Sequence, residues 1–173
     1  FIYGITAPSG TGKTTLLNLI GNILKPAQGE IETDFKTGIA YVFQEPELLS
    51  QLTIAENIAL PLAAYLKKEI AFEQAISILQ KMELDGFENR FPNELSFGQQ
   101  QRAAIARALT YPSPLRLMDE PFKGLDEALS RRIIKRIRER QTENGQTILF
   151  TSHNPGELRL FADKTVRLDP TSH

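Results

Sequence analysis

The sequence contains no cysteine, carries almost no net charge and has no long apolar run. Without cysteine, the chain can form neither a disulfide nor a thiolate metal site. The formal net charge of −1 gives no overall attraction to nucleic acid or anionic lipid, so we expect no direct nucleic-acid partner. The longest apolar run has nine residues, 58–66, whereas a membrane-spanning helix needs about 20. The sequence therefore predicts no helix that crosses a membrane.

The remaining composition is that of a globular protein with one domain. The 173 residues are 41% hydrophobic and 24% charged, and they contain no internal repeat or low-complexity tract. Phe1 already belongs to a predicted strand, so we expect the N-terminus of the domain to be incomplete.

The clearest motif is a loop with two glycines and a lysine, Ala7-Pro8-Ser9-Gly10-Thr11-Gly12-Lys13-Thr14-Thr15. A β-prone run precedes it at 1–6, and apolar residues follow it with helical spacing from Leu16 to Leu24. A loop of this kind directs several backbone N–H groups at one anion, although a glycine-rich turn with a chance lysine is the alternative. Lys13 would reach the outer phosphates of a nucleotide, and the Thr14 hydroxyl would coordinate Mg²⁺. The residues expected to hold the nucleotide are Ser9, Gly10, Thr11, Gly12, Lys13, Thr14 and Thr15.

Two short strands and a helical stretch follow. Residues 30–33 and 39–43 are predicted to form a small antiparallel flap, with Gln44 held where the second strand ends. Thr53 and Glu56 have the spacing of a capping box at the start of a helical stretch that runs to Met82. Its apolar face is predicted to consist of Phe72, Ile76, Leu79 and Met82.

A second helix start lies at Ser96, which forms a capping-box pattern with Gln99. The stretch from Leu95 to Arg102 runs directly into an alanine-rich helix, and Gly98 lies in its first turn. The N-terminus of this helix is a second candidate phosphate grip, and an ordinary capped helix is the alternative reading.

Polar residues end two further predicted strands. The strand 115–118 leads into Asp119-Glu120, and the strand 147–151 leads into Ser152-His153. Ligands bind at the carboxyl ends of strands in open α/β sheets, so one carboxylate can face Mg²⁺ while its neighbour faces an attacking water. A solvated acidic turn is the alternative. Arg116 is an unexpected charge in a strand that should be buried on both faces.

The helix that begins at Leu125-Asp126-Glu127 is rich in basic residues. Acidic residues lie in its first turn and bases in the rest, which complements the helix dipole. We interpret the basic run as a solvated face, because interleaved aromatic residues typical of a nucleic-acid patch are missing. The buried stripe is predicted to consist of Leu129, Ile133, Ile134 and Ile137. A further helix starts at Asn154-Pro155, and 165–168 is a last short strand.

The order of these sites resembles the nucleotide-binding domain of ATP-binding cassette (ABC) ATPases. The matching motifs are the phosphate loop at 7–15, the glutamine loop at Gln44, the signature at 95–102, the Walker B strand with Asp119-Glu120, the D-loop at 124–126 and the switch histidine His153. The resemblance implies an α/β P-loop NTPase with a mainly parallel central sheet, a small antiparallel β flap and a helical subdomain. It implies a single domain over 1–173, with its core at 1–46 and 111–173 and the helical subdomain at about 47–110.

The resemblance also implies a role for each motif residue. Thr14 and Asp119 would hold Mg²⁺, and Gln44 would sense the metal and the water. Glu120 would be the general base, and His153 would stabilise the transferring γ-phosphate. Residues that would act on the ATP of a second, head-to-tail domain are Ser96, Gly98 and Gln99, and Asp126 of the D-loop is also expected to bind nucleotide.

Two residues depart from the family pattern. Ala7 replaces the first glycine of the phosphate loop, which is tolerable only where φ is negative. Phe97 replaces the first of the two signature glycines, so we expect a weaker contact across the dimer. The aromatic residue that stacks on adenine in this family would lie upstream of Phe1.

The expected function is therefore that of an ATPase subunit of an ABC transporter. It would bind ATP and Mg²⁺, form a homodimer or pair with another ABC subunit, and lie in the cytoplasm against the inner face of the membrane. Transmembrane permease subunits would bind near Gln44 and residues 47–66. The segment 44–49 and the short flap resemble import ATPases of the nitrate, sulfonate and taurine group.

Three alternatives differ in their sequence features. A soluble ABC ATPase that acts on nucleic acid or ribosomes would bring paired cassettes or long insertions. A nucleotide-binding regulator without hydrolysis would not need both Glu120 and His153. A small-molecule kinase has no use for the signature at Ser96.

Overall fold

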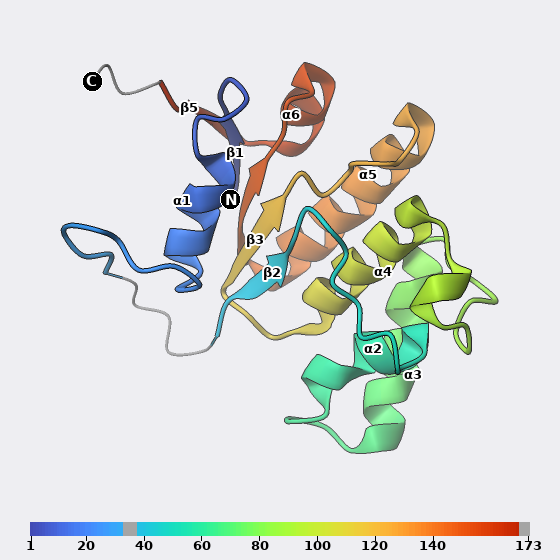
Figure 1. Cartoon of the computed structure of the whole chain (residues 1–173). Helices are drawn as coiled ribbons and strands as arrows, with labels where there is room; N and C mark the ends of the chain where they lie inside the picture. The colour runs from blue at the N-terminus through green and yellow to red at the C-terminus, as the bar shows by residue number, and fades with distance from the viewer. Residues whose placement is uncertain (33–37, 170–173) are drawn as a thin grey trace.

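The computed structural model describes residues 1–32 and 38–169. Helices and strands alternate from β1 onward, with a group of helices inserted between β2 and β3 (Figure 1). The strands are β1 (Ile2–Thr6), β2 (Ala40–Val42), β3 (Leu115–Asp119), β4 (Thr147–Thr151) and β5 (Lys164–Arg167). The helices are α1 (Lys13–Ile20), α2 (Ile54–Ala59), α3 (Lys68–Lys81), α4 (Phe97–Thr110), α5 (Glu127–Asn144) and α6 (Pro155–Phe161), with 3₁₀ turns at Leu60–Leu62 and Pro92–Glu94.

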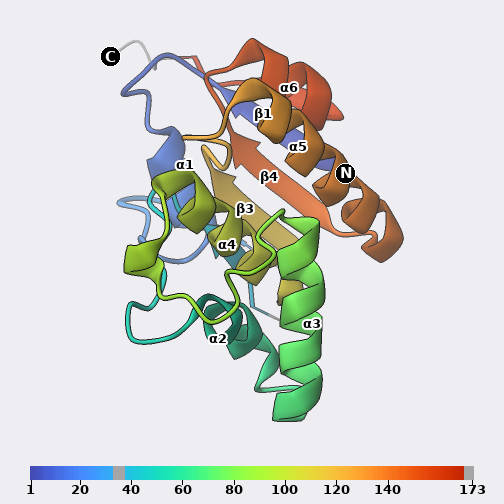
Figure 2. The same ribbon diagram turned by 90° about the vertical axis from the view of Figure 1, so that its right-hand side faces the viewer.

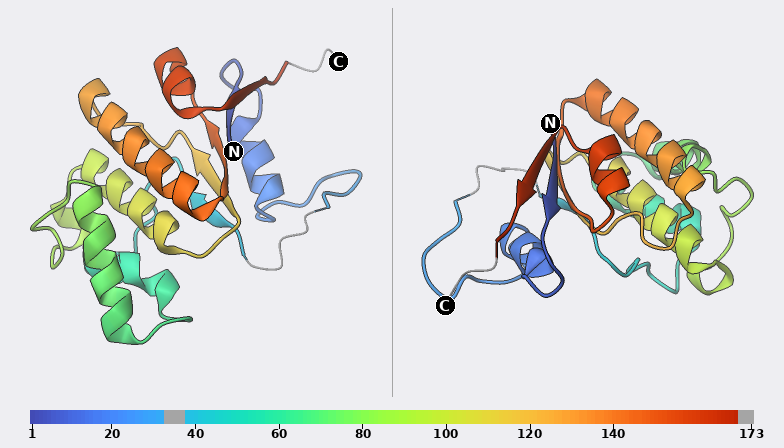
Figure 3. Two further views of the ribbon diagram at one scale, coloured as in Figure 1. Left: turned by 180° about the vertical axis from the view of Figure 1, so that it is seen from behind. Right: turned by 90° about the horizontal axis from the view of Figure 1, so that it is seen from above.

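The five strands form one sheet in the order β2-β3-β4-β1-β5, and every neighbouring pair is parallel. Helix α1 lies on one face of the sheet, and α5 and α6 lie on the other (Figure 3). A sheet covered on both faces needs apolar side chains on both, which explains the near-continuous apolar strands. The parallel central sheet that the sequence predicts is confirmed.

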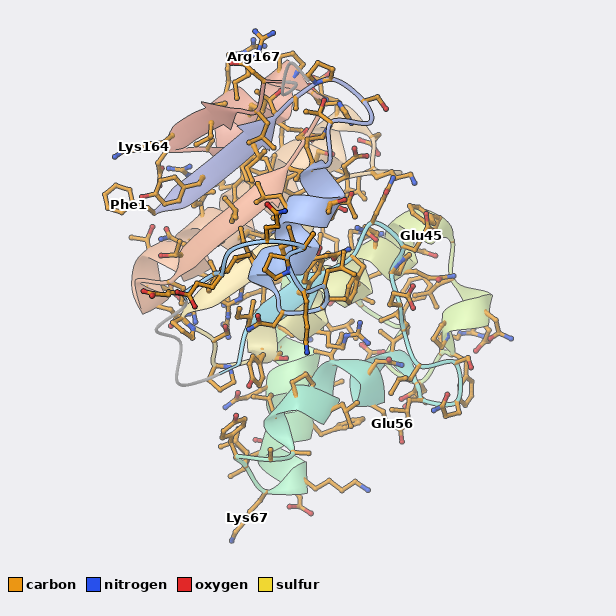
Figure 4. All side chains as sticks on the ribbon, turned by 60° about the vertical axis from the view of Figure 1, so that its left-hand side comes forward. Phe1, Glu45, Glu56, Lys67, Lys164 and Arg167 are labelled. Carbon is orange, nitrogen blue, oxygen red and sulfur yellow. The ribbon has the colours of Figure 1, made fainter. Side chains whose placement is uncertain are left out.

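Side chains of β3 alternate between two cores, as the period of a strand requires. Leu115 and Leu117 pack with Leu17 of α1 on one face. Met118 packs with Phe150 of β4 and the helices of the opposite face. The edge strand β5 is exposed along its length; Figure 4 shows Lys164 at its start, near Phe1, and Arg167 at its other end.

The inserted helices α2, α3 and α4 pack on one another, with α4 between the other two and the sheet (Figure 2). The capping box at Thr53 is present: its hydroxyl accepts from the Glu56 N–H, and the Glu56 carboxylate accepts from the Thr53 N–H. The buried face of α3 differs from the predicted one by about one residue. Leu79 and Met82 are buried as predicted, but the other buried positions are Ala71, Ala75 and Ile78, and Phe72 and Ile76 lie at the margin. Within the described part of the chain, no helix is long and apolar enough to cross a membrane.

The prediction of an antiparallel flap is wrong for the part of the flap that the structure describes. β2 is an edge strand of the central sheet and pairs in parallel with β3, with Val42 opposite Met118. Residues 30–32 form no strand, and 33–37 lie outside the described residues. The continuous apolar run at 39–43 indicated a strand but could not indicate its partner, which lies more than 70 residues further along the chain.

The first helix is shorter than predicted. α1 ends at Ile20, and the Gly21 N–H donates to the Leu17 carbonyl at 2.8 Å. Asn22 then adopts a φ of 57°, a left-handed conformation that ends the helix. Ile23 and Leu24, which continue the apolar period, are exposed.

Arg116 is buried in β3 and holds the end of α4. Its guanidinium donates to the carbonyls of Ala108 at 3.0 Å, Leu109 at 3.2 Å and Tyr111 at 2.9 Å, and to the Gln146 side chain. These carbonyls lie at the C-terminus of α4, where no helical N–H remains to satisfy them. Burial, with a contribution from nearby Arg140, lowers the pKa of Arg116 to about 10. The unexpected charge is thus a helix cap.

We expect Arg116→Met to lower the free energy of unfolding by about 2–3 kcal/mol, because several buried carbonyls lose their donor. Urea denaturation followed by circular dichroism measures the loss. Arg131→Met changes an exposed arginine of α5, and its free energy of unfolding should stay within about 0.5 kcal/mol of that of the wild type. Equal stability of the two variants would show that Arg116 does not secure α4.

Candidate functional site

The predicted site residues gather at the carboxyl edge of the sheet. Parallel strands bring their carboxyl ends to one edge, and the register places Asp119 of β3 beside Thr151 of β4, which in turn lies beside Ile5 of β1. The loops that follow β1, β3 and β4 therefore meet there. These loops carry Lys13, Glu120 and His153.

The phosphate loop has the backbone that its glycines permit. Gly10 and Gly12 have φ values of 80° and 90°, a left-handed conformation that is costly for other residues. Lys13 is only 7% exposed, and its ammonium group donates to the carbonyls of Ala7 at 3.0 Å and Pro8 at 3.2 Å. Ala7 is buried and does not have a positive φ, so the condition for replacing the loop's first glycine is met.

A cavity of about 670 Å³ lies beside this loop, within the range of small-molecule sites. Its walls are the loop from Pro8 to Gly12, the first turns of α1 with Leu16 and Leu19, and the segment after β5. That last segment contributes Leu168 and Asp169, which sequence reasoning did not include. A signal was present, because Leu168 ends the last predicted strand and Asp169 follows it, and ligands bind at this edge of open α/β sheets.

Asp119 is the centre of the candidate metal site. It is 2% exposed and accepts hydrogen bonds from the Thr14 hydroxyl at 2.6 Å and the Thr151 hydroxyl at 2.5 Å. The predicted pair of Thr14 and Asp119 thus lies in direct contact. Hydroxyl and carboxylate oxygens are hard ligands of the type Mg²⁺ prefers, and Mg²⁺ completes its shell with phosphates and water, so these residues fit that ion.

Glu120 and His153 form a contact beside Asp119. The His153 Nε2 lies 2.8 Å from the Glu120 Oε1. Glu120 has a φ of 46°, a conformation that a glutamate rarely adopts, and its N–H donates to the Thr151 hydroxyl at 3.0 Å. Strained backbone held by neighbouring contacts is typical of functional sites.

A further carboxylate, Glu157, lies behind the histidine. The Ser152 hydroxyl donates to it, and the Asn154 N–H donates to Ser152 at 3.0 Å, so this network holds the loop that carries His153. Burial raises the pKa of Glu157, and the charge of Glu120 adds to the effect. Sequence reasoning missed Glu157, although it stands three residues after the helix cap Asn154, a spacing typical of a capping box.

Gln44 lies at the same edge. β2 is parallel to β3 with Val42 opposite Met118, so Gln44 follows the end of β2 at the edge where β3 ends at Asp119. It is partly buried at the turn after the strand. The next residue, Glu45, forms an ion pair with Lys123 at 3.2 Å, which connects this turn to the loop after Glu120.

The signature begins a capped helix, as its pattern predicts. The Gln99 side chain accepts from the Ser96 N–H at 2.9 Å, and the Ser96 hydroxyl accepts from the Gln99 N–H at 3.4 Å. Asp126 caps α5 by accepting from the Leu129 N–H at 2.9 Å. Among the described residues, the lining of the cavity beside the phosphate loop includes neither Gly98 nor any other signature residue.

Comparison with known proteins identifies the family of this chain. A family profile described as ABC transporter matches residues 2–123. This chain belongs to the ABC transporter family. Thiamine import ATP-binding proteins (ThiQ) of Shigella flexneri serotype 5b and Escherichia coli O157:H7 are each 37% identical over 172 residues, which cover 94% of this chain and 74% of the relative.

Solved structures of ABC cassettes have the same fold. A dimeric post-hydrolysis state of the ATP-binding cassette MJ0796, bound to ADP and phosphate, superposes with a TM-score of 0.87 and 34% identity, covering 98% of this chain and 81% of that one. A second dimeric structure of MJ0796, described as a bacterial ABC transporter cassette, superposes with a TM-score of 0.87 and 34% identity, covering 97% of this chain and 80% of that one. This chain is accordingly an ATP-binding, ATP-hydrolysing subunit of an ABC transporter. Its assignment to the nitrate, sulfonate and taurine group stays a prediction.

We expect Glu157→Gln to change how stability depends on pH. Because the folded pKa is raised above the usual 4.5, the folded state binds more protons than the unfolded state above that pH, and the wild type loses stability as pH rises through this window. The variant does not lose stability in this way, so its melting temperature should rise relative to that of the wild type between pH 5 and about 7. Glu73→Gln, an exposed site on α3, is the control. A wild-type-minus-variant difference that stays constant with pH would contradict the burial of Glu157.

Proposed function

We propose that this chain holds Mg²⁺-ATP at its phosphate loop and hydrolyses it when a second ABC domain closes over the nucleotide. The observation that carries the proposal is the contact of Asp119 with Thr14, which joins the Walker B strand to the first turn of α1 beside the loop. Glu120 and His153 lie next to this contact, and a cavity of about 670 Å³ opens on the other side of the loop.

Residues 9–15 hold the phosphates. Backbone N–H groups at the start of α1 are free of helical partners and carry the positive end of the helix dipole, so they suit an anion. Lys13 makes its contacts with the carbonyls of Ala7 and Pro8, and a phosphate oxygen is a stronger acceptor for the same ammonium group. Thr14 and Asp119 supply the protein oxygens for Mg²⁺, which neutralises phosphate charge when bound, and Gln44 is the third residue proposed at this ion.

Glu120 acts as the general base. It follows the strand that ends at Asp119, and its left-handed backbone turns its carboxylate toward His153. A carboxylate here can orient a water for in-line attack and take up its proton. His153 lies within hydrogen-bond reach of Glu120 and is placed to donate to a phosphate oxygen.

A second domain completes the site. MJ0796, whose fold this chain shares, is described as dimeric with ADP and phosphate bound. In this chain the signature residues Ser96, Gly98 and Gln99 stand at their own helix N-terminus, away from the lining of the cavity. We infer that they and Asp126 bind the nucleotide of the partner, which is a second copy or a paired ABC subunit. The N-terminus of α1 then binds the phosphates of the chain's own nucleotide, and the N-terminus of α4 binds those of the partner's nucleotide.

The helical insertion offers a surface for a permease. Between α2 and α3 lies a groove of about 310 Å³ with a largely apolar lining that includes Leu52, Leu60 and Phe72, and with Glu56 and Lys68 at its rim. Leu60 is 47% exposed, which is unusual for a leucine in a groove unless a partner covers it. The relatives are named as import proteins for thiamine, so their transport crosses a membrane. We infer that a helical segment of a membrane-spanning subunit docks here, which places the chain on the cytoplasmic face of the membrane.

We expect Glu120→Gln to keep ATP affinity and lower the turnover number at least about 100-fold, because general-base assistance is worth that much. The amide keeps an oxygen that can accept from His153, so the geometry is retained. Without hydrolysis, ATP should drive the variant into a stable dimer. Phosphate release measures turnover, and size-exclusion chromatography with and without ATP measures the dimer.

Lys13→Ala is the matched control in the same experiment. It should bind ATP about tenfold more weakly or worse, since a charge-assisted contact contributes about 1.5–3 kcal/mol, and it should not dimerise with ATP. Unchanged turnover in Glu120→Gln would contradict the general-base role. Unchanged ATP affinity in Lys13→Ala would contradict the phosphate cradle.

We expect Leu60→Glu to weaken the association with the permease. A carboxylate in the apolar groove would be desolvated by a docked helix without a partner. Tagged full-length protein is purified from membranes of its own organism with mild detergent, and the co-purified membrane-spanning subunit is quantified by mass spectrometry. Recovery should fall at least about fivefold, since even a 1 kcal/mol loss of binding energy has that effect. Ile70→Glu changes an exposed apolar residue outside the groove lining, and it should co-purify as much of the membrane-spanning subunit as the wild type does. Equal recovery for both variants would rule the groove out.

A further inference from the structure

Phe97, which replaces a glycine of the family signature, packs on the D-loop of its own chain. A Cβ atom added at Gly124 would lie 2.6 Å from Phe97 Cδ1 and 3.1 Å from Cε1. Gly124 also has a φ of 79°, which disfavours any side chain there. The ring therefore occupies the space that a side chain at Gly124 would need. The aromatic side chain is turned onto the D-loop of its own chain.

The backbone of the signature touches the same glycine. A Cβ atom added at Gly98 would lie 2.7 Å from the Gly124 carbonyl oxygen. Real Cβ atoms do not approach a backbone atom so closely, so Gly98 and Gly124 are both required for the contact. The first turn of α4 and the D-loop thus meet backbone to backbone, with the Phe97 ring beside them.

Lys123 connects this contact to the glutamine loop. Its ammonium nitrogen lies 5.6 Å from the centre of the Phe97 ring, within range of a cation–π interaction, and 3.2 Å from the Glu45 carboxylate. Figure 4 shows Glu45 on the loop that follows β2. One lysine therefore contacts the residue after Gln44 and the residue before Gly98.

Helix α4 makes two further contacts with the glutamine loop. The Gln101 side chain donates to the Phe43 carbonyl at 3.4 Å, and the Arg107 guanidinium donates to the Pro46 carbonyl at 3.4 Å. Together with the pair of Lys123 and Glu45, these contacts flank Gln44 on both sides. A movement of the glutamine loop would be transmitted to the start of α4.

We propose that Phe97 and Lys123 are positioning residues, and that together with Glu45 they form a clamp that fixes the signature helix against the D-loop and the glutamine loop. The proposal rests on the proposed function, in which Gly98 binds the nucleotide of a second domain. The clamp sets the direction in which the N-terminal N–H groups of α4 face that domain. The ion pair of Lys123 and Glu45 is exposed, and each contact is weak alone, but three segments held at one point have few ways to rearrange.

The test compares variants that break and keep the clamp. Lys123→Met removes the charge and keeps the length of the side chain, and Lys123→Arg keeps the cation. Phe97→Ala removes the ring, and Phe97→Leu keeps apolar bulk on Gly124. Each is made in the full-length protein, with and without Glu120→Gln. Circular dichroism melting confirms that each variant is folded.

Three readouts separate positioning from folding. A fluorescent ATP analogue reports affinity at the chain's own phosphate loop, which should stay within about twofold of the parent because the clamp contributes no residue to that cavity. Lys123→Met should weaken ATP-driven dimerisation about threefold, and Phe97→Ala at least as much, consistent with losing a cation–π contact and its packing. The turnover number should fall with little change in KM, and Lys123→Arg should restore it.

A double variant tests whether the two residues act together. If Lys123 acts through the ring, Lys123→Met should have little further effect in a Phe97→Ala background. If the parent protein dimerises and hydrolyses ATP, and Lys123→Met and Phe97→Ala do so equally well, the clamp is contradicted while the proposed function stands. A parent that does neither overturns the proposed function, and the clamp with it. Independent, additive effects of the two substitutions would also contradict the clamp.

Discussion

The carboxylate of Asp119 is the contact on which the rest of the site depends. It accepts from Thr14 at the start of α1 and from Thr151 at the end of β4, so one buried group joins three elements. A buried carboxylate without partners would be costly, and the two hydroxyls satisfy it at the place proposed for Mg²⁺. Thr151 also accepts from the Glu120 N–H, so the same contact fixes the strained turn that carries the candidate base.

Parallel pairing explains why residues so distant in sequence share one edge. Each strand delivers its following loop at the same end of the sheet, and the register decides which residues are level. β2 is informative because its three residues carry no chemistry themselves. Their pairing with β3 sets Gln44 at the edge where β3 ends and brings Glu45 to Lys123. The edge strand thus places the glutamine loop against the loop after Asp119.

Local patterns predicted most of the elements, and long-range pairing accounts for most of the errors. Glycines, caps and apolar periods act within a few residues, so the glycine-rich loop and the capping boxes were predictable, whereas the parallel sheet was implied by the family resemblance. The partner of β2 was not, because nothing in 39–43 encodes a pairing with β3. Arg116 could be seen as anomalous, but its role depends on α4 ending beside β3. Glu157 matters only because the fold brings Ser152 and Glu120 to it.

The signature shows how one local structure can serve two purposes. Ser96 and Gln99 form a helix cap within the chain, and this alone would explain their spacing. A cap, however, requires nothing of Gly98, where alanine would be the better helix former. The glycine is explained by the carbonyl of Gly124, which leaves no room for a Cβ atom. Close contact between the signature and the D-loop is therefore a constraint separate from helix formation, and it is met where an ABC domain would face its partner.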